Sequence, residues 1–341
     1  MARLIGRLFA AIAALALLGG AAGCDDYNPN QRLAVLDIEN GRSRTISPAD
    51  RSVSMAVWSP DSQSLLVQEG WAEGRAVVRR EAVTGRRQWE VSGAWEEAAP
   101  AAAAFSPDGE RVALLRFDFV GEAAGSALEM LDSDSGETRS EAPVWSVSAG
   151  VGPSVPVIHE VEWMSDGRIA VLGVRGSLAD LFILDPSEDW AVTTQPTVGH
   201  EGRMSASPKG GWIAVLGDEG LVLHAGDGTA SLIRDDVSGN VDFAFSPDGM
   251  QLVLASNARI SVYDIAAGTW ITVTEAHSNG VAWSPSGLIT WASGPDVLTM
   301  LPDGSERAVV VHVDGGKSVR HPEWSPDGTK LAYVVEPPYR D

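Results

Sequence analysis

One short phrase recurs along this chain and constrains its fold more than any other feature. Ala-Phe-Ser-Pro-Asp-Gly stands at 104–109 and again, unchanged, at 244–249. Related phrases make seven copies, whose equivalent positions are Trp58, Phe105, Trp163, Ala206, Phe245, Trp283 and Trp324. The steps between these positions are 47, 58, 43, 39, 38 and 41 residues. A period of about 40 to 45 residues is typical of the four-stranded blade of a β-propeller.

The phrase itself predicts a tight turn between two strands. Proline fixes φ at the second position of a type I turn, and aspartate at the third hydrogen-bonds nearby backbone. Glycine then adopts the left-handed conformation that closes the hairpin. Some copies of the phrase differ from Ser-Pro-Asp-Gly, and the residues that replace Pro, Asp or Gly in them, Ser62, Ser165, Lys209 and Ser286, all fall at turn positions. We therefore interpret the phrase as a structural marker and not as a chemical site.

A second hairpin lies between the markers and brings each repeat to four strands. It consists of a strand that ends in Asp and a turn that ends in Gly, as at 37–41, 132–136 and 264–268. The segment 132–136, Asp-Ser-Asp-Ser-Gly, aligns with these turns and lacks the downstream glutamate of a calcium loop, so we interpret it as a turn.

The two ends of the repeat region are each incomplete. The hairpin at 33–46 has no marker before it, and the marker hairpin at 319–335 has no partner after it. We expect the two to share one blade, because closing the ring removes exposed strand edges. The predicted fold class is all-β: a seven-bladed β-propeller of four-stranded antiparallel blades over 33–336, followed by a short tail at 337–341.

The repeats resemble the WD-type repeats of TolB-like β-propellers. The resemblance is carried by the W/F-S-P-D-G phrase, the apolar strand after it and the D-x-x-x-G hairpin, and it covers 33–336. It implies the propeller fold. TolB also has an α/β domain before its propeller, for which we find no counterpart ahead of Leu33, so we do not carry over the Tol partnership.

The first 23 residues have the features of a secretion signal. Arg3 and Arg7 precede an apolar run at 8–18, which is too short to span a membrane, and small residues follow it. The alternative is an amphipathic or buried N-terminal helix. We therefore expect residues 1–23 to be a signal peptide that is removed.

Cys24 is the only cysteine, and Ala21-Ala22-Gly23-Cys24 resembles the lipobox of bacterial lipoproteins, with Ala21 in place of the usual Leu. The resemblance implies that Cys24 carries lipid and that 24–32 form a polar tether; the alternative is a buried free thiol. Asp25 and Asp26 resemble the signal that retains lipoproteins on the inner membrane. We therefore expect the protein in the bacterial cell envelope, on the periplasmic side of the inner membrane in preference to the outer membrane.

The charge balance and the missing motifs narrow the possible functions. A net charge of −21 repels phosphate backbones, so we expect no nucleic-acid partner. The chain has no G-x-S-x-G nucleophile motif. The segment 315–318, Gly-Gly-Lys-Ser, resembles the end of a P-loop, but Val311 stands where the first Gly belongs.

Four histidines lie three to six residues before a marker position, near the start of the innermost strand of their blades: His159, His200, His277 and His321. Some TolB-like propellers that cleave oligogalacturonate use histidines there to hold a metal ion, and imidazole suits Mn, Zn or Fe. The resemblance thus supplies an alternative function, a metal-dependent oligosaccharide lyase. The offsets differ among blades, so we favour solvated histidines and expect no cofactor.

Tryptophans divide into structural residues and candidates for recognition. Trp58, Trp163, Trp283 and Trp324 occupy marker positions, where we expect them to pack between blades. Trp71 and Trp145 are expected in loops and are candidate recognition residues.

In a four-stranded antiparallel blade, the turn between the second and third strands lies on the same face of the ring as the connections to neighbouring blades. We therefore expect the long segments 117–126 and 141–157 on one face, together with the four histidines. The favoured function is a non-catalytic, monomeric, membrane-anchored propeller that binds a protein or envelope component there.

Overall fold

The computed structural model describes residues 30–94, 99–120, 123–139, 145–148, 156–175, 178–197, 203–217, 219–237, 241–256 and 258–338. The expected signal peptide and Cys24 lie outside these residues.

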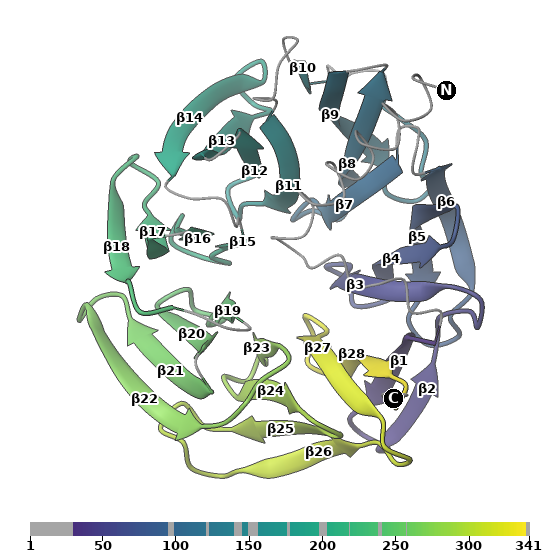
Figure 1. Ribbon diagram of the computed structural model, residues 1–341, viewed down its shortest axis with the longest axis vertical. Helices are drawn as coiled ribbons and strands as arrows, with labels where there is room; N and C mark the ends of the chain where they lie inside the picture. Colours follow the sequence, from purple (N-terminus) through teal and green to yellow (C-terminus); the bar gives the residue numbers. More distant parts are fainter. Residues whose placement is uncertain are drawn as a thin grey trace, which may run out of the picture.

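The described residues form seven four-stranded antiparallel sheets arranged in a ring (Figure 1), and this confirms the predicted fold class. Blade 1 consists of β3 (Ser52–Trp58), β4 (Ser64–Trp71), β5 (Gly74–Glu81) and β6 (Arg87–Ala94). Blade 2 consists of β7 (Ala99–Phe105), β8 (Arg111–Val120), β9 (Ala123–Asp132) and β10 (Trp145–Ser148). Blade 3 consists of β11 (Pro156–Trp163), β12 (Ile169–Arg175), β13 (Leu178–Asp185) and β14 (Ala191–Thr197). Blade 4 consists of β15 (Arg203–Ala206), β16 (Ile213–Gly217), β17 (Gly220–His224) and β18 (Ala230–Arg234). Blade 5 consists of β19 (Asp242–Phe245), β20 (Gln251–Ser256), β21 (Arg259–Asp264) and β22 (Thr269–Glu275). Blade 6 consists of β23 (Val281–Trp283), β24 (Ile289–Ser293), β25 (Asp296–Met300) and β26 (Ala308–His312).

Blade 7 joins the two ends of the chain. Its strands are β27 (Ser318–Trp324), β28 (Lys330–Glu336), β1 (Arg32–Asp37) and β2 (Arg42–Thr45). The N-terminal β1 pairs with the C-terminal β28 over six residue pairs, from Arg32 with Val335 to Asp37 with Lys330. The ring is therefore closed by the shared blade that the incomplete end repeats predict.

The marker turns hold their shape through the serine as much as through Pro, Asp and Gly. In blade 2 the Ser106 hydroxyl donates to the Asp108 carboxylate at 2.5 Å and accepts the backbone N–H of Arg111 at 2.9 Å. Gly109 has φ 75° and its N–H donates to the Ser106 carbonyl. The same serine–aspartate pair recurs in three other blades, at Ser59 and Asp61, Ser246 and Asp248, and Ser325 and Asp327. The serine is buried, and its hydroxyl connects the turn to the strand that follows it.

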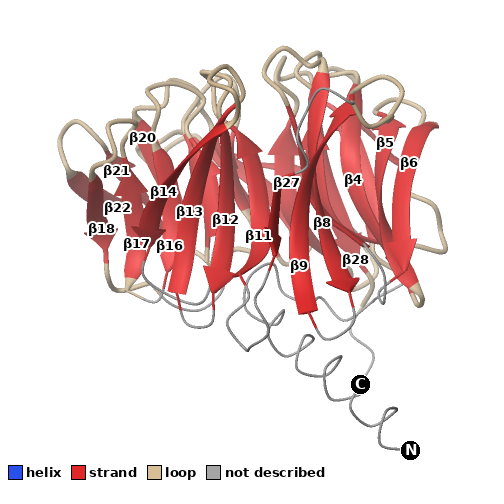
Figure 2. Ribbon diagram, turned by 90° about the horizontal axis from the view of Figure 1, so that it is seen from above, coloured by secondary structure: helices blue, strands red, loops and turns tan. Residues whose placement is uncertain are grey.

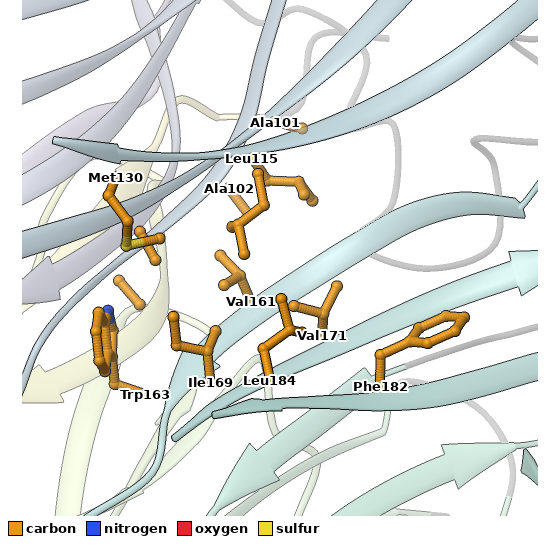
Figure 3. Close-up of a cluster of buried hydrophobic side chains, with 13 residues drawn as sticks. Ala101, Ala102, Leu115, Met130, Val161, Trp163, Ile169, Val171, Phe182 and Leu184 are labelled. Atoms are coloured by element: carbon orange, nitrogen blue, oxygen red, sulfur yellow. The ribbon is translucent and has the colours of Figure 1, made fainter. Parts of the chain in front are cut away.

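Among the residues that the structure describes, seven buried hydrophobic clusters hold the blades together, and each spans a boundary between neighbouring blades. Figure 3 shows the one between blades 2 and 3, in which Leu115 and Met130 face Val161, Trp163 and Ile169. Because apolar side chains from two sheets interleave there, no blade buries its core alone. The blades should therefore unfold together.

Three of the four marker tryptophans also bond to the preceding blade through their indole N–H groups, whereas the indole N–H of Trp163 has no hydrogen-bond partner among the described residues. Trp58 donates to the carbonyl of Glu323 at 2.9 Å, and Trp283 to that of Ala244 at 3.1 Å. Trp324 donates to the Thr290 hydroxyl at 2.8 Å. These contacts confirm that the marker tryptophans pack between blades.

The strands run between two faces of the ring (Figure 2). The marker turns and the D-x-x-x-G turns lie on one, which we call the marker face. The turns between the second and third strands of each blade lie on the other, together with the connections between blades. In blade 7 the end of β28 and the start of β1 take the place of that turn, so the chain enters and leaves the fold on this second face. We call it the entry face.

Candidate binding face

A pocket of about 350 Å³ opens on the entry face at blade 1. It is lined by residues of the connection from β2 to β3 and of the turn from β4 to β5: Asp50, Arg51, Trp71, Ala72 and Glu73. Trp71 is half-buried and the other apolar residue, Ala72, is exposed. The pocket thus offers an indole beside two carboxylates and one guanidinium.

Arg51 fixes the indole and is itself held by two carboxylates. Its guanidinium carbon lies 4.7 Å from the centre of the Trp71 ring. Its terminal nitrogens lie 3.3 Å from Glu69 and 3.1 Å from Glu90. Burial alone would lower the pKa of Arg51, but the hydrogen bonds and charges of Glu90 and Glu69 outweigh burial and raise it. Arg51 therefore stays charged, and its charge is balanced inside the protein.

Both carboxylates that hold Arg51 have a second arginine. Glu69, which is fully buried, accepts hydrogen bonds from Arg80 at 2.5 and 3.0 Å. Glu90 lies 2.6 Å from Arg87. Burial would raise the pKa of Glu90, but Arg51 and Arg87 lower it. This network fixes Arg51 in the pocket wall, since two carboxylates hold Arg51 and a second arginine holds each of those carboxylates.

The two segments that form the pocket are held in place by their neighbours. The side chain of Arg32, the first residue of β1, donates to the carbonyls of Ala49 and Arg51. A Cβ on Gly74 would collide with the carbonyl of Gly93 and lie 3.2 Å from the Trp71 ring, so only glycine fits there. The pocket therefore adjoins the point at which the chain enters the fold.

Trp71 and Trp145 are not loop residues, and this part of the sequence interpretation was wrong. Trp71 is the last residue of β4 and pairs with Gly74, and Trp145 is the first residue of β10 and pairs with Leu128. The segment 117–126 is not a long loop either, because β8 and β9 pair out to Val120 and Ala123. Strands β8 and β9 pair regularly over ten residue pairs, so this segment extends the hairpin.

The structure places His159 and His321 on inner strands and His277 just before an inner strand. His159 is the fourth residue of β11, and His277 is exposed in the segment that leads to β23. His321 lies in β27 with φ 47°, and its N–H donates to the carbonyl of Asn279 at 3.0 Å, next to the segment of His277. His200 lies outside the described residues. Within the described ranges no group of three or more His, Cys, Asp or Glu is arranged to hold a metal ion.

Carboxylates on the inner strands near the axis were not anticipated from the sequence. Glu160 and Glu162 alternate on β11 with the buried Val161 and Trp163, a pattern that could have revealed them. Glu162 accepts the N–H of Ala206, and Glu160 that of Met204, on the inner strand of the next blade. Ala206 is the marker position that lacks an aromatic residue, so a carboxylate from the preceding blade makes the link there.

The pKa values of Glu160 and Glu162 lie above the usual range of a glutamate. Burial raises the pKa of Glu160 to about 7, although the charge of Arg203 opposes the rise. Burial raises the pKa of Glu162 to about 8, and the nearby Glu160 and Glu323 add to the rise.

No helix among the described residues is long and apolar enough to cross a bilayer.

The fold and its closure define the class of protein: a seven-bladed β-propeller with a shared terminal blade. No family model and no curated protein matches the sequence.

Among solved structures, the chain is similar to a protein assigned as TolB from Agrobacterium tumefaciens, at 19% identity and a TM-score of 0.50, over 91% of this chain and 99% of that one. It is also similar to an oligogalacturonate lyase in complex with manganese, at 14% identity and a TM-score of 0.56, over 91% and 92% of the two chains. A third similar structure is the dihydro-heme d1 dehydrogenase NirN, at 15% identity and a TM-score of 0.57, over 89% and 68%. At these identities the likeness shows the fold alone, a β-propeller.

Proposed function

We propose that this protein is a membrane-anchored propeller lipoprotein of the bacterial cell envelope, which binds a protein or another envelope component on its entry face without catalysing a reaction. The observation that carries the proposal is the position of Arg32. It begins the fold on the entry face, directly beside the Trp71 pocket, and stands eight residues after Cys24.

The length of the tether sets how the propeller meets the membrane. Eight residues span at most about 28 Å when fully extended. A lipid on Cys24 therefore keeps the entry face close to the bilayer and turns the marker face away from it. In this orientation the pocket meets components at or near the membrane surface.

The envelope location draws support from two directions. The lipobox-like sequence before Cys24 and the two aspartates after it favour the periplasmic side of the inner membrane. The similarity to a protein assigned as TolB is consistent with an envelope protein.

Anchoring is tested by fractionating cells that express the wild type or Cys24→Ser after growth with a palmitate analogue. We expect the wild type to carry label and sediment with membranes, and Cys24→Ser to be unlabelled and to enter the soluble periplasmic fraction. Wild-type protein without label would exclude the lipid anchor.

The alternative is a metal-dependent propeller enzyme, which the similarity to a manganese-bound oligogalacturonate lyase supports. Of the candidate histidines in the described residues, His159, His277 and His321, the last two lie on neighbouring segments, so such a site is tested at these two. Metal analysis of the purified protein separates the two functions. Stoichiometric metal that is lost on replacing both histidines with alanine would favour the enzyme, and its absence would favour the scaffold.

A further inference from the structure

We propose that the Trp71 pocket binds a basic side chain, lysine or arginine, presented by a partner polypeptide. This inference rests on the proposed function, because it names the chemistry of the partner that the entry face binds.

Two of the residues that line the pocket, Asp50 and Glu73, carry carboxylates that are available to a ligand. Asp50 and Glu73 are exposed, line the pocket, and make no hydrogen bond or ion pair with the rest of the described chain. An ionised carboxylate only accepts hydrogen bonds, whereas ammonium and guanidinium groups only donate them. A basic side chain therefore matches the hydrogen-bonding chemistry of both carboxylates.

The cation already in the pocket does not cancel these two charges. Arg51 is paired with Glu69 and Glu90, neither of which lines the pocket, so its charge is already balanced. An anionic ligand such as phosphate would meet Asp50 and Glu73 as like charges at close range. The charge distribution of the pocket thus favours a cation.

The apolar surface of the pocket suits the stem of a basic residue. Lysine and arginine lay their methylene chains along apolar surface while the charged head stays among polar groups. Trp71 and Ala72 supply that surface in the pocket that the two carboxylates also line. The net charge of −21 adds a longer-range attraction that raises the rate at which basic segments arrive.

The pocket is also formed before any ligand arrives. Arg51 holds Trp71, the buried Glu69 holds Arg51, and Arg32 holds the backbone of the Asp50 segment. Binding then orders few protein side chains, which lowers its entropic cost.

The experiment measures binding of a blocked tetralysine peptide to the full mature chain by calorimetry at low ionic strength. The pocket variant is Asp50→Asn with Glu73→Gln, which preserves shape and removes two charges. The control is Glu39→Gln with Glu137→Gln, two exposed carboxylates of marker-face turns whose loss changes the net charge equally. We expect the pocket variant to bind about tenfold more weakly and the control to change affinity by less than about twofold.

Three results would overturn the inference. Equal weakening in both variants would mean general attraction to an acidic surface. Equal binding of the peptide with acetylated lysines would mean that the charge is not recognised. Binding to phosphatidylethanolamine vesicles that needs Asp50 and Glu73, without peptide binding, would assign the pocket to a lipid amine. Each of these results leaves the lipid label on Cys24 and the membrane fractionation unchanged, so a failure here is distinguishable from a failure of the proposed function.

Discussion

Truncating Leu33 tests whether the N-terminal strand is an integral part of the ring. Leu33 lies in β1, is 1% exposed and pairs with Val334 of β28. It packs in the cluster between blades 7 and 1 with Val53 and Trp58. If β1 closes the ring, Leu33→Ala leaves a cavity in a boundary that the whole propeller shares.

The size of the effect follows from the burial of this side chain. Removing a fully buried leucine side chain costs about 3–4 kcal/mol in the free energy of unfolding, through lost transfer energy and the cavity left behind. A domain of roughly 300 residues unfolds with an entropy of about 0.6 kcal/mol/K, so the expected fall in Tm is about 5 °C.

Scanning calorimetry of the variant, with Leu232→Ala as control, measures this shift. Leu232 lies in the outer strand β18 and is 51% exposed, so its truncation should change Tm by less than about 1 °C. We expect one transition in both variants, because the blades share their cores. A Leu33→Ala protein that melts with the wild type, or that loses blade 7 in a separate early transition, would refute ring closure as the basis of stability.

Three further outcomes are expected. Burial raises the pKa values of Glu160 and Glu162, so between about pH 4.5 and about pH 8 the folded protein keeps protons that the unfolded chain has lost. These protons stabilise the fold below about pH 4.5, and that stabilisation is lost as the pH rises to about 8. The double variant Glu160→Gln with Glu162→Gln should flatten this fall in the urea midpoint, and an unchanged slope would place its origin elsewhere. Ser106→Ala should cost about 1–2 kcal/mol in urea unfolding because Ser106 holds both strands of its turn, and a neutral result would contradict that role. Trp283→Phe should lose about 1 kcal/mol with the hydrogen bond to Ala244, and equal stability would show that ring packing alone suffices.

The architecture could be predicted from the sequence because it depends on local turns that repeat. Each marker turn is specified within a few residues, so counting markers gives the blades, and the incomplete end hairpins give the shared blade. The role of Ser106 was missed because its hydroxyl bonds the residue five positions on, beyond the turn itself.

The candidate site could be predicted only in part, because it depends on contacts between distant segments. Trp71 was singled out from the sequence, but Asp50 and Arg51 reach it from another connection, and local sequence does not reveal that meeting. Strand lengths on the entry face were also misjudged. Residues 117–126 extend a hairpin, although their many small residues are typical of a loop.

Site-specific photo-crosslinking in cells tests most directly whether the entry face binds an envelope component. A photoreactive amino acid replaces Ala72, at the pocket, or Glu39, in a marker-face turn, and both positions are exposed. We expect a discrete adduct from position 72 in the anchored protein and none from position 39. The same adduct from position 39, or none from position 72, would contradict binding through the entry face.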